Sequence, residues 1–387
     1  MPSWTRGCAM TEIAGTFTAP IPEAKPGRSL WSDAWARLRA NRAAMVSAVY
    51  LVAMTIACVI GPMLTPHDFS TIYQNYTRVP PSLAPYPSLD MIEPSLQDAV
   101  RKGRMELSSW EQDGSRVTLS VTSKRPIDER VSRYVDRSDM FDGTADVVVA
   151  ADGLSATMTT GVEQKYFLFG TDNSGRDLLT RTLIAGRVSL AIGLLAGVVA
   201  VVIGVLYGAV AGFVGGKTDE VMMRIVDILY SLPFIFFVIM LVVFFGRNFV
   251  LMFLAVGAVL WLDMARIVRG QALTLKRQEF VQAAEALGVG QWGILMRHIV
   301  PNLLGPVAIY MTLLVPQVII LESFLSYLGL GVQEPMSSWG VLISQGAKNM
   351  PSANWLLFFP AMFLITTLFA LNFIGDGLRD ALDPKDR

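Results

Sequence analysis

Long apolar runs alternate with polar stretches along the 387 residues of this chain. A helix needs about 20 apolar residues to cross a bilayer core, and six segments approach that length. These segments are Ala43–Leu64, Val188–Val214, Ile225–Gly246, Phe249–Ile267, Leu303–Phe324 and Trp355–Ile374. The pattern predicts an all-α membrane protein with six transmembrane helices. Only Arg247-Asn248 separates the third and fourth segments, so a helical hairpin that does not fully cross the membrane is the alternative there.

The composition agrees with a membrane protein and limits the kinds of site that the chain could hold. Hydrophobic residues make up 52% of the chain and charged residues 17%, whereas soluble proteins carry about 25% charged residues. The formal net charge is +0, so nothing indicates nucleic acid as a partner, and membrane lipid is the expected surrounding. The cysteines and histidines (Cys8, Cys58, His67 and His298) are too scattered to predict a disulfide framework, a metal site or a catalytic centre.

The distribution of Lys and Arg predicts the orientation, because positive residues gather in short cytoplasmic loops. With the N-terminus inside, the inner segments hold Lys25, Arg28, Arg37, Arg39, Arg42, Lys217, Arg224, Arg266, Arg269, Lys276, Arg277, Arg297, Arg379, Lys385 and Arg387. The two short outer loops hold only Arg247 and Lys348. Both termini are therefore expected in the cytoplasm. Residues 1–42 lack the apolar core of a signal peptide, and the start at Met1 or Met10 stays open.

The first span, residues 43–65, is followed by a polar stretch of mixed charge at 66–168. Asp113-Gly114 and Asp152-Gly153 are hairpin-turn signals between strand-like segments. We therefore predict a small α+β domain outside the membrane, inserted before the core transmembrane domain at 169–387. A structural cap over the helices and a docking surface for a substrate-delivering protein are both open as its role.

The second span carries small residues every four positions, namely Ala196, Ala200, Gly204, Gly208, Gly212 and Gly216. One helix face is then almost bare, so another helix can pack closely against it. The end of this stripe, Ala211–Thr218, reads AGFVGGKT and approaches the phosphate-loop pattern. A phosphate loop must follow a buried strand, whereas this match ends a membrane helix. We therefore expect no nucleotide site in this chain.

The segment 266–302 lies between the fourth and fifth spans and is expected in the cytoplasm. It is basic and helical in pattern, and Gln282-Ala283-Ala284 begins a surface of small residues. Gly288 and Gly290 are expected to break the helix, after which a second helical piece runs to Pro301. A short helix with small side chains can seat in a groove on a partner protein. A helix that lies on the membrane surface is the alternative.

This stretch resembles the coupling motif of ABC-importer permeases, E-A-A-x3-G-x9-I-x-L-P. Gln282 stands at the Glu position, while Ala283, Ala284, Gly288 and Pro301 match. His298 and Val300 replace the usual Ile and Leu. The resemblance implies that this segment docks into a cleft of an ATP-binding subunit. The loss of the Glu charge puts any salt bridge at that surface in doubt.

Further segments are similar to the second, C-type subunit of oligopeptide and dipeptide permeases. They read SLWSDAWARLRANRAAMVS, FGTDNSGRDLLTRTLIAGRVSL, DEVMMRIVDILYSLP, ARIVRGQALTLKRQEFVQAAEALG, SFLSYLGLGVQEPMSSWGVLI and GDGLRDALDPK. They occur in order over 29–66 and 167–387, nearly everything except the insert. Because the insert is longer than the family pattern leads us to expect, its role is not carried over.

The resemblance implies a bacterial inner-membrane importer built from two permease subunits, two ATP-binding subunits and an external solute-binding protein. ATP and magnesium would then be bound by the partner subunits, and this chain would have no enzymatic activity. It would form half of the translocation pathway. Peptides are the expected substrate, and nickel, opines or oligosaccharides are the alternatives within the same family.

Four polar residues fall inside the expected spans: Asp227, Asp263, Gln317 and Glu322. Such residues are functional candidates by default, although bonding between helices or reaching to the membrane surface is favoured over substrate contact here. Trp339 and Gly340 match a family motif in the last external loop, and the resemblance makes them candidates for contact with the binding protein.

An ion-coupled secondary transporter is the rival function. It would need a coupling-ion site near the middle of the membrane and often shows an internal inverted repeat. The sequence shows neither a pair of acidic residues in mid-span nor a clear repeat.

Overall fold

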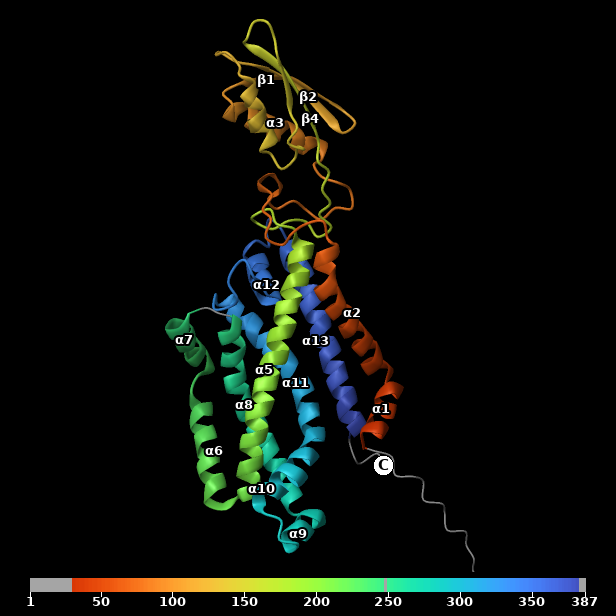
Figure 1. Ribbon diagram of the computed structural model, residues 1–387, viewed down its shortest axis with the longest axis vertical. Coiled ribbons are helices and arrows are strands. Elements are labelled where there is room, and N and C mark those ends of the chain that lie inside the picture. The colour runs from red at the N-terminus through yellow and green to blue at the C-terminus, as the bar shows by residue number, and fades with distance from the viewer. Residues whose placement is uncertain (1–29, 247–248, 383–387) are drawn as a thin grey trace, which may run out of the picture.

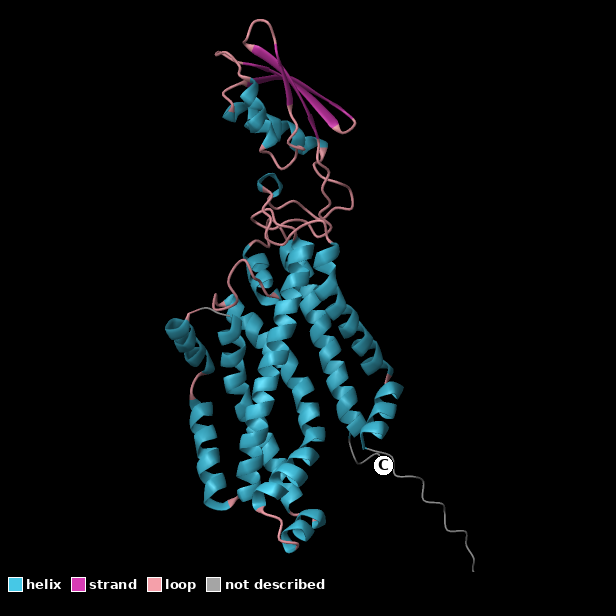
Figure 2. Ribbon diagram, viewed as in Figure 1, coloured by secondary structure: helices cyan, strands magenta, loops and turns pink. Residues whose placement is uncertain are grey.

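The computed structural model describes residues 30–246 and 249–382, and every structural statement below concerns those residues. Several positions named above lie outside the described residues: Cys8, Met10, Lys25, Arg28, Arg247, Lys385 and Arg387. The described chain is mostly helical, with one small sheet at one end of the molecule (Figures 1 and 2).

The helical bundle is built from eleven helices joined by short loops. They are α1 (Leu30–Ala40), α2 (Arg42–Leu64), α5 (Leu178–Val214), α6 (Gly216–Ser231), α7 (Phe234–Phe245), α8 (Phe249–Lys276), α9 (Glu279–Ala286), α10 (Gln291–Ile294), α11 (Val300–Tyr327), α12 (Trp339–Lys348) and α13 (Trp355–Leu382). A π-helical turn, Leu295–Ile299, joins α10 to α11. Helix α1, α9 and the C-terminal end of α13 lie toward the end of the molecule opposite the sheet (Figure 1).

Among the described residues, four stretches are long and apolar enough to cross a membrane. They are α2, α5, α13 and the continuous run Gln291–Tyr327. Helices α6 and α7 count together as a fifth, although the chain bends by 85° between them. The expected third span is therefore not one straight helix. Pro233 lies at the break, where its ring fixes φ and removes a backbone donor. The full count of six stays a prediction.

Residues 66–168 form a separate unit with its own apolar core. It contains α3 (Leu89–Lys102), α4 (Ser132–Asp136), 3-10 turns at Gln74–Tyr76 and Glu129–Val131, and the strands β1 (Glu106–Asp113), β2 (Arg116–Thr122), β3 (Asp146–Val149) and β4 (Ser155–Gly161). The strands form an antiparallel sheet in the order β1-β2-β4-β3. The inward face of β2 presents Val117, Leu119 and Val121 to this core, and its other face is open.

Helix α5 is the central element of the bundle. Asp177 caps its first turn by accepting hydrogen bonds from the backbone N–H and the hydroxyl of Thr180, at 2.8 and 2.6 Å. Its other end stops after Val214, because Gly215 takes a positive φ of 73°. The helix packs against α2, α8 and α11 along its length. Its faces therefore hold the bundle together.

An arginine of α5 satisfies a backbone carbonyl that a proline leaves without its helical donor in α2. Pro62 has no N–H, so the carbonyl of Cys58, four residues earlier, loses its helical donor. Arg187 of α5 donates to that carbonyl at 2.6 Å and to the carbonyl of Val59 at 2.5 Å. A polar group inside an apolar bundle must be satisfied internally. Arg187 therefore ties α2 to α5.

Candidate functional site

The segment after α8 folds into two short helices that meet at a sharp corner. Helix α9 ends at Ala286, and Gly288 adopts a φ of +78° that a residue with a side chain rarely takes. The N–H groups of Leu287 and Val289 close this corner by donating to the carbonyls of Ala283 and Ala284, at 3.0 and 3.1 Å. The corner therefore depends on the glycine at 288.

Helix α9 has one buried and one open face. Val281 and Ala284 are buried in the core of the bundle, whereas Gln282 and Ala283 are exposed. The sequence interpretation placed Ala284 on a surface for a partner, and the structure contradicts this. In a helix, residues three apart share a face, so Ala284 follows Val281 into the core. A substitution at Ala284 would therefore disturb this chain itself.

Two large apolar side chains beside the corner are exposed. Leu287 shows 84% of its surface and Trp292 shows 67%. Phe280, Val289 and Met296 are also exposed and lie close by in sequence. A contiguous exposed apolar surface marks a site of interaction with another molecule. Sequence reasoning concentrated on the small residues and missed these large ones, although both flank the glycines that it identified.

Gly290 caps α10, and Pro301 lies in the first turn of α11. The second helical piece was expected to run to Pro301, but the structure shows a helix that continues through the proline to Tyr327. The π-helical turn before it explains the difference, because the wider turn accommodates a residue without an N–H. The side chain of Asn302 donates to the carbonyl of His298 at 2.6 Å, which satisfies one group left over at this irregularity.

The glycine stripe of α5 lies against α8. A Cβ atom at Gly204, Gly208 or Gly212 would lie 2.6, 2.4 or 2.6 Å from an atom of α8, so the two backbones are nearly in contact. Gly216 does not belong to this contact. It begins α6 with a positive φ, and nothing lies within 4 Å of a Cβ placed there. The stripe ends where Gly215 turns the chain away.

Two basic residues of α8 join it to α6 and to α5 at the α9 end. Arg269 of α8 makes a two-pronged ion pair with Asp219 of α6, at 2.5 and 2.6 Å. Lys276 donates to the carbonyl of Phe213 at 2.6 Å, which satisfies the open end of α5. Helix α8 leads directly toward α9. A displacement of α9 can therefore reach α5 through a stiff connection.

The phosphate-loop look-alike, Ala211–Thr218, spans the end of α5 and the start of α6. A helix precedes it rather than a strand, so it lacks the setting that such a loop requires. Within the described residues, no group of three or more His, Cys, Asp or Glu side chains could hold a metal ion.

Glu322 lies fully buried in the last two turns of α11. Its Oε1 atom accepts hydrogen bonds from the hydroxyls of Ser326 and Ser338, at 2.7 and 2.5 Å. Ser338 is also the N-cap of α12 and accepts from the N–H of Val341 at 3.2 Å. Glu322 therefore positions α12. Gln317, by contrast, is exposed on α11 and is available to a neighbouring molecule.

Trp339 and Gly340 were expected to face an external partner, and the structure contradicts this. Trp339 is 0% exposed, and its indole N–H donates to the carbonyl of Thr182 at 2.9 Å. A Cβ atom at Gly340 would lie 2.4 Å from the Cα of Ser323. Both residues therefore fix α12 inside the bundle. A sequence motif alone does not distinguish packing from contact with a partner.

An ion-pair cluster joins the buried residues Asp172, Arg176 and Arg181, at the start of α5, to the exposed Glu334 in the loop before α12. Asp172 receives hydrogen bonds from Arg176, at 2.8 Å, and from Arg181. Arg176 also donates to Glu334 at 2.8 Å. The pKa of Glu334 is lowered, chiefly by that hydrogen bond and further by the charges of Arg176 and Arg181. No signal in the sequence indicates this cluster, because Glu334 lies 158 residues after Arg176 along the chain.

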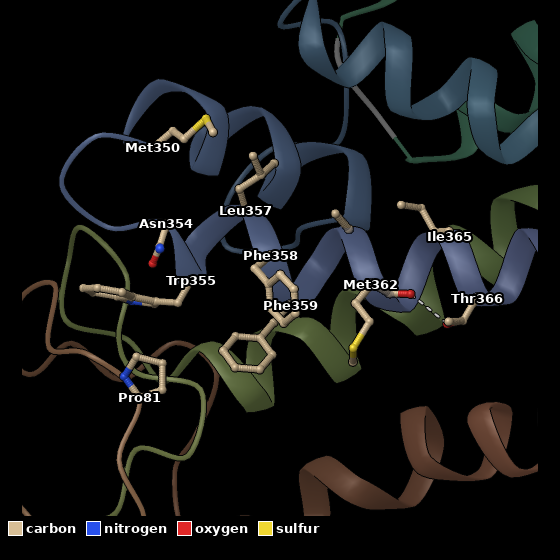
Figure 3. A pocket seen from close by; sticks show the side chains of 11 residues that line it. Pro81, Met350, Asn354, Trp355, Leu357, Phe358, Phe359, Met362, Ile365 and Thr366 are labelled. Atoms are coloured by element: carbon tan, nitrogen blue, oxygen red, sulfur yellow. Dashed lines mark hydrogen bonds between the residues drawn. The ribbon is translucent and has the colours of Figure 1, made fainter.

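A cavity of about 740 Å³ lies on the outward side of α13 (Figure 3). Aromatic and aliphatic side chains line it, among them Trp355, Phe358 and Met362, and Pro81 from the base of the insert closes one end. Aromatic rings are enriched where a membrane meets water. This end of α13 therefore has the character of a membrane boundary.

Comparisons with known proteins assign this arrangement to a family. Residues 179–387 match the family model "Binding-protein-dependent transport system inner membrane component". Residues 29–87 match the "N-terminal TM domain of oligopeptide transport permease C". The first match covers most of the bundle after the insert, and the second covers the helices before the insert and the first part of the insert itself.

Several characterised proteins are similar to the chain. The oligopeptide transport system permease protein OppC of Escherichia coli K12 is 65% identical over 219 residues, which is 57% of this chain and 72% of that protein. OppC of Bacillus subtilis is 36% identical over 94% of this chain and 92% of that protein. The dipeptide permease protein DppC of the same organism is 35% identical, over 94% of this chain and 88% of that protein.

A solved structure of the MetNI methionine ABC transporter in an inward-facing conformation is 19% identical, with a TM-score of 0.44, and covers 52% of this chain and 96% of that one. The family matches and the identities to the permease proteins confirm the resemblance seen in the sequence. The chain belongs to the family of binding-protein-dependent transport system inner membrane components.

Proposed function

We propose that this chain is a pore-forming subunit of an ATP-driven peptide importer in the bacterial inner membrane, and that it forms half of the translocation pathway. The names of its OppC and DppC relatives support a peptide substrate. Other substrates of the same importer family, such as nickel, opines or oligosaccharides, are the alternative. A second permease subunit completes the pathway, and an external binding protein delivers the substrate.

The observation that carries this proposal is the exposed apolar surface at the α9–α10 corner. Leu287 and Trp292 project from a corner that is anchored to the bundle by Val281 and Ala284. Such an arrangement is what a docking element requires: a rigid base and an apolar tip that a partner can bury. The ATP-binding subunits, which carry ATP and magnesium, are the proposed partner.

The surface of α9 retains negative charge, although Gln282 stands at the Glu position of the motif. Gln282 is exposed, and Glu279 and Glu285, also exposed, lie three residues before and after it. Residues at that spacing share a helix face. A carboxylate therefore remains available to a positive group on the partner, although it comes from a neighbouring turn.

Energy would pass from the corner into the membrane through α8. ATP binding closes the two nucleotide subunits and moves α9 in this mechanism. The hydrogen bond of Lys276 to the carbonyl of Phe213 and the glycine contact join α8 to α5, and the ion pair of Arg269 with Asp219 joins α8 to α6, so these helices would move together. The importer must then have two states of similar free energy, and ATP must favour one of them.

The proposed topology has six transmembrane helices, with both termini inside and the insert outside. Several features support it. The sheet and the α9 corner lie at opposite ends of the molecule (Figure 2). Lys276, Arg277 and Arg297 lie at the α9 end, as expected for the cytoplasmic side. The α6–α7 pair and α8 supply the third and fourth spans.

Reconstitution in vesicles tests the function. We expect vesicles that contain this chain, its second permease, the ATP-binding subunits and the binding protein to accumulate a labelled tripeptide only when ATP is present. Leaving out this chain is the control and should abolish uptake. Uptake driven by this chain alone, without an ATP-binding subunit, would show that it is a self-sufficient transporter instead.

A further inference from the structure

One carboxylate inside the bundle is not accounted for by the contacts described above. Asp227 pairs with Arg266 at 2.9 Å, and Glu322 is held by two serine hydroxyls. Asp263 of α8 makes no hydrogen bond or ion pair within the part of the chain that the structure describes. It lies 13 residues before Lys276, the last residue of α8, which is roughly 20 Å along the helix. Asp263 is therefore a carboxyl group in the middle of the helix that has no hydrogen-bonded partner among the described residues, although the charge of Arg266 acts on it.

Asp263 lines a cavity of about 300 Å³ between α8 and the bent pair α6–α7. The other walls are mainly apolar, with Leu229 and Leu232 beside the bend, Phe237 from α7, and Leu262 beside Asp263. The lining comes from both sides of the 85° bend. A concave apolar pocket with one polar group at a defined place is the usual form of a ligand site.

The nearby positive charge is already engaged. The guanidinium of Arg266 pairs with Asp227 and lies 4.3 Å from the centre of the Tyr230 ring. A carboxylate surrounded by apolar walls gains most from a cation brought by another molecule. Lysine and arginine side chains combine such a cation with an apolar stem that suits the walls.

The pocket is accessible from outside this chain. Helix α6 buries only Val226 against the rest of the chain, while Leu229, Tyr230 and Leu232 are 40%, 52% and 52% exposed. The α6–α7 pair lies beside α8, on the side of the bundle away from α2 and α13 (Figure 1). A volume of 300 Å³ is at the lower limit of small-molecule sites. It therefore suits one side chain rather than a whole peptide.

We propose that the pocket between α8 and the α6–α7 bend is a subsite of the translocation pathway, in which Asp263 binds the cationic side chain of a transported peptide. This inference rests on the proposed peptide importer. It makes Asp263 a residue that determines specificity, favouring peptides with lysine or arginine over neutral peptides of the same length.

The experiment compares two peptides in the complete reconstituted importer. Alanyl-lysyl-alanine and its neutral counterpart alanyl-methionyl-alanine are supplied at concentrations that saturate the binding protein, so that the measured rates report passage through the permease. The importer carries the wild-type chain, Asp263→Asn, Asp263→Glu or the control Glu220→Gln. The control removes an exposed carboxylate of α6 that lies outside the pocket lining and leaves the pair of Asp227 with Arg266 intact.

We expect Asp263→Asn to lower the ratio of lysine-peptide uptake to neutral-peptide uptake about tenfold, corresponding to about 1.4 kcal/mol. Asp263→Glu should restore most of the ratio, and Glu220→Gln should leave it as in the wild type. An unchanged ratio in Asp263→Asn, or an equal loss for both peptides, would overturn the inference.

Copurification of the second permease subunit provides a separate readout. If Asp263→Asn releases that subunit, the carboxylate pairs with a cation of the partner, and the subsite is refuted. A wild-type importer that takes up neither peptide refutes the proposed function itself, so the two failures are distinguishable.

Discussion

At the scale of single residues, buried polar groups explain how loops far apart in the chain are held together. The cluster of Asp172, Arg176, Arg181 and Glu334 fixes the base of the insert to the loop before α12. Its charges balance in formal terms, with two carboxylates and two guanidinium groups. A buried charge is tolerated only when it is paired in this way.

The lowered pKa of Glu334 predicts how stability depends on pH. A carboxyl group whose pKa is lower in the folded protein contributes its full stabilisation above its ordinary value of 4.5. The contribution is lost as the pH falls below 4.5 and through the folded-state pKa. We therefore expect the unfolding temperature of the solubilised protein to fall more between about pH 5 and pH 3 in the wild type than in Glu334→Gln.

The control for this measurement is Glu106→Gln, which removes an exposed carboxyl group from β1. Its curve should follow the wild type. Identical curves for the wild type and Glu334→Gln would mean that the pairing with Arg176 does not contribute to stability.

At the scale of helices and strands, the close packing of α5 and α8 was predictable and its extent was not. Small residues at every fourth position specify a bare helix face. The sequence does not specify which helix covers that face, and it placed Gly216 in the stripe although the chain turns at Gly215. The stripe ends where the chain turns at Gly215 and Gly216, two adjacent glycines that both have a positive φ.

Gly208→Ala tests the α5–α8 contact. The new methyl carbon would lie 2.4 Å from the carbonyl oxygen of Ala265, and since that atom belongs to the backbone the helices must separate. We expect a loss of about 1–3 kcal/mol in stability, seen as a lower unfolding temperature. The matched control is Gly270→Ala on α8, where nothing lies within 4 Å of the added Cβ. Equal unfolding temperatures for the two variants would contradict the close contact.

Other elements show which structural features the sequence pattern predicts and which it does not. The two Asp-Gly turns mark the hairpins β1–β2 and β3–β4, because the residue at each turn needs a positive φ. The apolar run of the third span, however, carries no signal for an 85° bend except Pro233. Around the α9 corner, the motif identified the glycines but not which side chains face the core. That distinction separates Ala284 from Ala283, and it depends on packing against the bundle.

At the scale of the whole molecule, the described residues form several separate apolar cores. One fills the insert, and the others lie within the helical bundle. Several exposed surfaces of the bundle are apolar as well, as expected for a protein whose helices meet lipid. Residues predicted to contact external partners, Trp339 and Gly340, instead hold the bundle together. The surface at the α9 corner is the one that the account assigns to energy coupling.

The affinity of the ATP-binding subunits for the permease pair tests this assignment most directly. Leu287→Ala and Trp292→Ala truncate exposed side chains at the corner, whereas Leu83→Ala truncates a side chain that is 87% exposed near the insert. Burying one such side chain at an interface is worth about 1.5–3 kcal/mol. We therefore predict binding about tenfold weaker or more for each corner variant, and unchanged binding for Leu83→Ala. Wild-type affinity in both corner variants would contradict the account.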